Sequence, residues 1–254
     1  DRSPANCRQL HARRGHGVKV GYFASVEEVN RDSLIGACVV VIDVLRASST
    51  IVAALASGAE RVIPIADVAT ACRLARPGER MAKILAGERH GTAVDGFDLG
   101  NSPREFSPER VGGKTIVFTT TNGTRALSMS AKAGRVIVAA LTNVHAVAEA
   151  IRGESSVVVI CCGSEGSVAS EDLLCGGLLL ELLGDLVDRG ALNDAARLSL
   201  LLAERFGGNV ENFLRETDHG RRLVSLGFEA DIAACAASAT IDIVPALREG
   251  AITR

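Results

Sequence analysis

Asp43 is the first polar residue after an apolar run at residues 37–42, and Arg46 follows it closely. Three hydroxyl side chains come next: Ser48, Ser49 and Thr50. A carboxylate can bind a divalent cation, and a guanidinium beside a helix N-terminus can bind phosphate or sulfonate oxygens. This turn therefore predicts a cation site at Asp43 and an anion site at Arg46 and the hydroxyls. A plain helix start, capped by Asp43 or Ser48, explains the same residues.

A second polar turn, at residues 119–124, follows another apolar run at residues 114–118. Its glycine allows a ligand to approach the backbone, and its hydroxyl and N–H groups can form a concave anion site. The residues that we expect to contact the anion are Thr120, Thr121, Asn122, Gly123, Thr124 and Arg125. The alternative is an ordinary turn in which Thr124 caps the next helix.

Carboxylates in other segments complete the candidate site. Glu165 follows the apolar run at residues 156–160 and suits Mg²⁺, which takes few carboxylates together with water and phosphate oxygens. Glu171 and Asp172, in the first turn of the next predicted helix, suit either a site or the helix dipole. Residues 85–103 read as a long loop rich in glycine and charge, and such loops are usually functional. Its candidate residues are Glu88, Arg89, Asp95 and Asp98.

The three turns share one local pattern, a strand followed by a polar turn and a helix. Parallel strands joined by right-handed crossovers bind ligands beyond their carboxyl ends. We therefore predict an α/β fold, a layered α/β/α arrangement with a largely parallel sheet, in which the three turns meet at one crevice. The pattern after residue 191 predicts three helices and a last strand, at residues 192–206, 210–216, 221–226 and 241–244.

Composition agrees with this fold and excludes several functions. The chain has 254 residues, of which 47% are hydrophobic and 3% aromatic, so aliphatic side chains must build the core. A net charge of −2 argues against nucleic-acid binding, and no apolar segment is long enough to span a membrane. The seven cysteines, several of them in apolar runs, indicate reduced thiols in a cytoplasmic protein. Residues 1–17 are basic and read as a disordered extension.

Spacing argues against several known phosphatase chemistries. Cys161 and Cys162 are followed six positions later by Ser167 and Val168, so neither begins a cysteine-phosphatase loop. The second aspartate of the haloacid dehalogenases, two positions after Asp43, is absent. The triplet at residues 89–91 looks like that of the histidine phosphatases, but it has no evident partner histidine.

Four segments together resemble the 2-phosphosulfolactate phosphatase family in order and separation: VVVIDVLRASSTIVAAL, LAGERHGTAVDGFDLGNSP, KTIVFTTTNGTRAL and CCGSEGSVASEDLLCGG. The resemblance implies a magnesium-dependent phosphatase that releases phosphate from (R)-2-phospho-3-sulfolactate on the route to coenzyme M. The site residues that it implies are Asp43, Arg46, Glu88, Asp98, Asn122, Thr124 and Glu165. The chain departs from the family pattern at His90 and Ala239.

The resemblance runs from about residue 18 to the C-terminus and gives the domain organisation. It implies one phosphatase domain at residues 18–254, for which two closely packed lobes at about 18–110 and 111–254 are one arrangement. The segment at residues 219–223 also fits the family, with Arg221 as an expected anion contact. A homodimer is compatible with the sequence.

We therefore expect metal-assisted hydrolysis of a small, anionic phosphomonoester. Mg²⁺ would be held by Asp43, Asp98 and Glu165, while Arg46 and Glu88 complete the catalytic group. Arg89, Arg221 and the hydroxyl-rich turns would hold the substrate. The nucleophile is either water or Asp43. Hydrolysis of another phosphorylated hydroxy acid, and anion binding without catalysis, are the alternatives.

Overall fold

The computed structural model describes residues 17–75 and 82–254, so the predicted extension lies, apart from Gly17, outside the described residues. Strands occupy β1 (Lys19–Phe23), β2 (Cys38–Ile42), β3 (Arg61–Pro64), β4 (Lys83–Arg89), β5 (Thr92–Ala93), β6 (Thr115–Thr119), β7 (Arg135–Ala139), β8 (Ser156–Cys161), β9 (Ala246–Arg248) and β10 (Ala251–Thr253). Helices occupy α1 (Ala47–Ala56), α2 (Val68–Leu74), α3 (Pro108–Val111), α4 (Gly123–Met129), α5 (Val144–Ile151), α6 (Ser170–Leu183), α7 (Asp194–Phe206), α8 (Val210–Glu216), α9 (Asp218–Ser225) and α10 (Glu229–Ala236).

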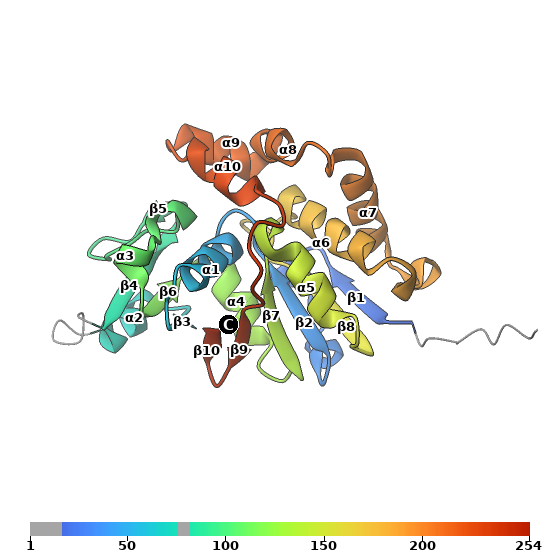
Figure 1. The fold of residues 1–254 in the computed structure, drawn as a ribbon, viewed down its shortest axis with the longest axis horizontal. Coiled ribbons are helices and arrows are strands. Elements are labelled where there is room, and N and C mark those ends of the chain that lie inside the picture. Colours follow the sequence, from blue (N-terminus) through green and yellow to red (C-terminus); the bar gives the residue numbers. More distant parts are fainter. Residues whose placement is uncertain (1–16, 76–81) are drawn as a thin grey trace, which may run out of the picture.

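The described strands form one sheet in the order β1-β8-β2-β7-β9-β10-β3-β6-β4-β5. Strands β1, β8, β2 and β7 run parallel to one another, and so do β3, β6 and β4. The antiparallel hairpin β9–β10 joins the two parallel groups, and Figure 1 shows it between them. The predicted layered α/β fold with a mostly parallel sheet is confirmed. The division into two lobes stays a prediction.

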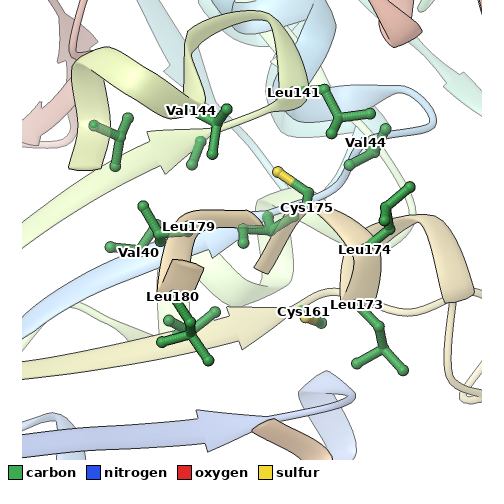
Figure 2. Close-up of a cluster of buried hydrophobic side chains, with 14 of the residues drawn as sticks. Val40, Val44, Leu141, Val144, Cys161, Leu173, Leu174, Cys175, Leu179 and Leu180 are labelled. Atoms are coloured by element: carbon green, nitrogen blue, oxygen red, sulfur yellow. The ribbon is translucent and has the colours of Figure 1, made fainter. Parts of the chain in front are cut away.

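Helices cover both faces of the sheet, and the alternation of side chains along β2 shows how. Val40 packs in a cluster with side chains of α5 and α6, whereas Val39 and Val41 pack in a second cluster with those of α1 and α4. Figure 2 shows the first cluster, in which α6 places Cys175 and Leu179 near Val40. A strand buried on both faces explains the unbroken apolar run that the sequence contains there.

Two predicted elements differ from the structure. The predicted loop at residues 85–103 begins with β4, whose Lys83–Arg89 segment pairs with β6 in the sheet. The predicted strand at residues 241–244 is not a strand, because Ile241 donates its N–H to the Thr142 carbonyl and the Ile243 carbonyl accepts from Asn143 Nδ2. Sheet pairing starts only at Pro245, whose carbonyl accepts the Val138 N–H.

Two other findings bear on the sequence predictions. Helices α1 and α4 begin earlier than predicted, so Ser48, Ser49, Thr50 and Thr124 lie inside helices rather than in turns. Within the described ranges, no helix combines the length and the apolar character that crossing a membrane would need.

Helices α6 and α7 pack closely against each other, and a glycine makes this contact possible. A Cβ atom added at Gly177 would lie 1.9 Å from the Ser199 carbonyl oxygen and 3.0 Å from the Ala203 Cβ. The adjacent Gly176 likewise leaves room for the Tyr22 hydroxyl, which accepts from Ser199 Oγ at 2.7 Å. Glycine at these positions therefore sets the distance between α6, α7 and β1.

We expect Gly177→Ala to lower the free energy of unfolding by about 1–3 kcal/mol, because the methyl group must push α7 away from α6. Urea denaturation followed by circular dichroism measures the change. Gly153→Ala is the matched control, since a Cβ there meets no atom within 4 Å. Equal stabilities of the two variants would contradict the close α6–α7 contact.

Candidate active site

One cleft gathers the turns that follow β2, β6 and β8, together with β4 and α9. Its lining residues are Asp43, Leu45, Arg46, Glu88, His90, Gly91, Asn101, Thr120, Thr121, Asn122, Ser164, Glu165, His219 and Arg222. The predicted meeting of the three turns is therefore what the structure contains. Glu88 joins them from a strand rather than from a loop.

Asp43 lies at the base of the cleft, directly after β2 and before α1. Its Oδ1 accepts the Ala47 N–H at 3.2 Å, and its own N–H donates to Ser48 Oγ at 2.9 Å. A Cβ added at Gly123 would lie 3.0 Å from Asp43 Oδ2, so glycine allows α4 to come close to this carboxylate. Burial raises the pKa of Asp43 to about 7, and the nearby Glu88 and Glu171 carboxylates add to the rise.

A buried carboxylate on α6 ties two of the turns together. Asp172 accepts the Val44 N–H on Oδ1 at 2.7 Å and the Gly163 N–H on Oδ2 at 3.1 Å. The carbonyl of the same Gly163 accepts Asn122 Nδ2 at 3.1 Å, which adds the turn after β6. The turns after β2, β8 and β6 are thus connected through the backbone N–H and carbonyl of one residue, Gly163.

Glu88 holds two other parts of the cleft wall. Its Oε1 accepts from the Thr121 N–H at 2.9 Å and from Thr121 Oγ1 at 3.1 Å, while its Oε2 accepts the Gly91 N–H at 2.7 Å. The turn after β6 and the turn between β4 and β5 are therefore held by a single carboxylate. Glu88 is 8% exposed, so these hydrogen bonds replace the water that burial removes.

Arg46 is almost fully buried and has fixed partners. Its Nη1 donates to Asp231 Oδ2 at 2.6 Å, its Nη2 donates to the Gly91 carbonyl at 2.8 Å, and its Cζ lies 4.3 Å from the centre of the Phe228 ring. Ser102 Oγ donates to the other Asp231 oxygen at 2.6 Å. This guanidinium therefore connects the turn after β2 to α10 and the β4–β5 turn.

An ion pair between α9 and the turn after β8 lines the cleft. Arg222 Nη1 donates to Glu165 Oε1 at 2.6 Å, and Nη2 donates to the His90 carbonyl at 3.0 Å. Both Glu165 and His90 have left-handed backbones, with φ of 49° and 54°, which are uncommon for residues other than glycine. The guanidinium lowers the pKa of Glu165, so this carboxylate is ionised at neutral pH.

His219 also faces the cleft, one helical turn from Arg222. Its Nδ1 lies 3.6 Å from Glu171 Oε1, which is buried without a hydrogen-bond partner. Burial lowers the pKa of His219 to about 4, and the Arg46 charge adds to the fall. The imidazole is therefore neutral at neutral pH.

Several predicted anion contacts instead hold the chain together. Ser48 accepts from the Asp43 N–H, Ser49 Oγ donates to the Val44 carbonyl, and Thr50 Oγ1 donates to the Asn101 carbonyl. Thr124 Oγ1 donates to the Thr120 carbonyl inside α4. None of the four hydroxyl side chains lines the cleft.

Four predicted charged residues also lie outside the cleft. Asp98 Oδ2 accepts the Leu85 N–H at 2.9 Å, and Arg89 donates to the carbonyls of Glu88 and Ala66 and to Thr119 Oγ1. Arg125 pairs with Glu27, and Arg221 pairs with Asp218. The structure brings Arg222 to the cleft in place of Arg221.

Four residues of the cleft and its surroundings were not among the predicted site residues: Asn101, His219 and Arg222 line the cleft, and Asp231 pairs with Arg46. The family-like segment at residues 219–223 contained a signal for two of them. His219 and Arg222 are three positions apart and share a helix face, whereas Arg221 does not. Asp231 gave no signal, because its partner Arg46 is 185 positions away.

The donors of the cleft fit a hard divalent cation such as Mg²⁺. Carboxylate and amide oxygens of Asp43, Glu88, Glu165 and Asn122 line it, and Mg²⁺ needs only one or two carboxylates besides water and phosphate oxygens. Burial first and the nearby Glu88 and Glu171 carboxylates second raise the pKa of Asp43, and a bound cation would offset both effects. Among the residues that the structure describes, no three His, Cys, Asp or Glu side chains already stand at metal-binding spacing.

Comparison with known proteins identifies the family. The model of the 2-phosphosulpholactate phosphatase family matches residues 23–250. The chain belongs to this family. Proteins named probable 2-phosphosulfolactate phosphatase include one from Caldanaerobacter subterraneus subsp. tengcongensis, which is 41% identical over 231 residues, 91% of this chain and 95% of that protein. Another, from Synechococcus sp. (strain JA-3-3Ab), is 44% identical over 215 residues, 83% of this chain and 88% of that protein.

In the absence of divalent cations, we expect Asp43→Asn to stabilise this phosphatase at pH 8. The pKa of Asp43 is about 7 in the folded chain against 3.8 for an unperturbed group, so the folded state holds a proton that the unfolded state loses. Stability therefore falls as pH rises from about 4 through 7. The neutral amide avoids that loss, and we expect a gain of about 1–3 kcal/mol at pH 8.

Urea denaturation in EDTA at pH 4 and pH 8 measures this gain, which should nearly vanish at pH 4. Glu165→Gln is the matched control, because its carboxylate is exposed and its pKa is lowered rather than raised. A destabilised Asp43→Asn protein at pH 8 would mean that the Asp43 carboxylate is not under electrostatic strain.

Proposed function

We propose that this chain is a Mg²⁺-dependent 2-phosphosulfolactate phosphatase, which hydrolyses the phosphomonoester of (R)-2-phospho-3-sulfolactate to sulfolactate and phosphate. The observation that carries the proposal is the buried Asp43 carboxylate, with its raised pKa, at the base of a cleft formed by three βα turns. Family membership supports the substrate, and the oxygen-rich lining supports the cation.

The cation would be held by Asp43, with Glu88 and Glu165 as the nearest further carboxylates of the cleft. Asp98, which the sequence analysis included, has its carboxylate on the Leu85 N–H and is not part of this proposed set. When bound, Mg²⁺ supplies positive charge that stabilises the phosphoryl oxygens during transfer. Thr121 and Asn122 would orient the phosphoryl group, because they line the same cleft as Asp43.

Arg46 would act from a fixed position. Its bonds to Asp231 and Gly91 prevent it from following the substrate, but its charge faces the cleft and favours a bound anion. Its fixed position means that no reorganisation is needed when negative charge develops on the phosphoryl oxygens.

The nucleophile is either Asp43 or a water molecule oriented beside it. Rapid acid quench during turnover distinguishes them, because attack by Asp43 leaves phosphate on the protein as an acyl phosphate and attack by water does not. Either route requires the ionised form of Asp43, as the attacking group or as a partner of the cation.

The proposal also covers the cellular location, the pathway and the oligomeric state of the enzyme. A cytoplasmic location is supported by the buried, unpaired thiols of Cys38, Cys161, Cys162, Cys175 and Cys235. The product, sulfolactate, is consistent with a step of coenzyme M biosynthesis. A homodimer stays part of the proposal, and sedimentation of the purified protein tests it.

We expect phosphate release from 2-phosphosulfolactate to stop in EDTA, to return with Mg²⁺, and to fall at least about 100-fold in kcat for Asp43→Asn. A malachite-green assay measures it, with phospholactate and phosphoglycerate as competing substrates. Asp242→Asn is the control, since this exposed carboxylate lies outside the cleft. Full activity of Asp43→Asn, or turnover that ignores EDTA, would refute the proposal.

A further inference from the structure

Two guanidinium groups line the described cleft, those of Arg46 and Arg222, and they differ in how tightly their partners hold them. Arg46 is 3% exposed and held by Asp231, Gly91 and the Phe228 ring. The Arg222 side chain is 38% exposed, and its charged partner is the Glu165 side chain, which is 61% exposed. Ion pairs at such exposure contribute little to stability, so Arg222 can exchange its partner at small cost.

The cleft is small for the ligand that the family requires. Its cavity volume is about 40 Å³, which is room for a few water molecules. The Arg222–Glu165 pair and the Arg222–His90 hydrogen bond connect α9 to two other residues that line the cleft. A substrate with a phosphate, a carboxylate and a sulfonate needs more room than this volume, and separation of the Arg222–Glu165 pair would enlarge the cleft.

An anionic group of the substrate could replace Glu165 as the partner of Arg222. Arg222 Nη1 holds a carboxylate oxygen at 2.6 Å, in the geometry that a substrate carboxylate or sulfonate would also use. The neighbouring His219 is neutral at neutral pH and does not compete as a cation. Once separated from Arg222, the ionised Glu165 carboxylate would be unpaired in the cleft.

We propose that Arg222 is the specificity-determining residue that binds the second anionic group of the substrate, the one not transferred, by exchanging Glu165 for it. This inference rests on the proposed function, because it assumes a substrate with more than one anionic group. It predicts selection against simple phosphomonoesters, which have no second anionic group to replace Glu165 on Arg222.

Calorimetric titration of the Mg²⁺-loaded protein with 3-sulfolactate and with inorganic phosphate tests the inference. We expect Arg222→Gln to weaken sulfolactate binding roughly 10- to 100-fold and phosphate binding less than about threefold. Glycerate, which carries the carboxylate without the sulfonate, shows which group Arg222 takes: loss of its binding assigns the carboxylate, and unchanged binding assigns the sulfonate.

Arg221→Gln is the matched control, because Arg221 lies on the same helix but pairs with Asp218 outside the cleft. It should leave both affinities unchanged. An equal loss of phosphate binding in Arg222→Gln, or sulfolactate binding that does not change, would overturn the inference. Thermal unfolding of Arg222→Gln checks that the variant folds.

A separate titration tests whether the ligand replaces Glu165 on Arg222. Without divalent cation, Glu165→Gln removes the carboxylate that competes for Arg222, so sulfolactate should bind more tightly than to the unaltered protein. Equal or weaker binding would overturn the exchange. If the unaltered protein releases no phosphate from any substrate, the proposed function fails, while these titrations still decide the role of Arg222.

Discussion

The site depends on the carboxylate of Asp172, which holds two strand ends at a fixed separation. It accepts the N–H of Val44, next to Asp43, and the N–H of Gly163, at the start of the turn that carries Glu165. Gly163 has φ of 70°, and an added Cβ would lie 2.3 Å from the Ser167 carbonyl oxygen, so the turn tolerates only glycine there. The carbonyl of Gly163 accepts Asn122 Nδ2. One glycine residue therefore connects three separate turns.

This arrangement brings several buried carboxylates close together. Burial raises the pKa of Asp43, Glu171 and Asp172. Repulsion from the Glu171 carboxylate raises the pKa of Asp43 and of Asp172 further. A scaffold without a ligand would gain stability by replacing such groups with neutral ones. Their presence is understandable if a cation offsets the charge, and the same cation would make the bound state the more stable one.

The sequence predicts the fold class and the meeting of the turns because both follow from local patterns. Unbroken apolar runs such as the one in β2 occur where a strand is buried on both faces, and a polar turn at its carboxyl end predicts a site. Glu88 lines the cleft, but it lies on a strand rather than in the loop that the sequence predicts. The glycine and charged residues of β4 are typical of a loop, so the local sequence does not predict a strand there. The strand forms by pairing with β6, which is distant in the sequence.

Side-chain direction is what local patterns could not supply. Ser48, Ser49 and Thr50 stand beside Asp43 in the sequence, yet their hydroxyls bond to backbone groups because α1 begins at Ala47 and turns them inward. Adjacent residues on a helix point about 100° apart, so only one of two neighbouring arginines on α9 can face the cleft. Which one does so depends on how α9 packs. Its buried Leu223 fixes that rotation and directs Arg222 toward Glu165.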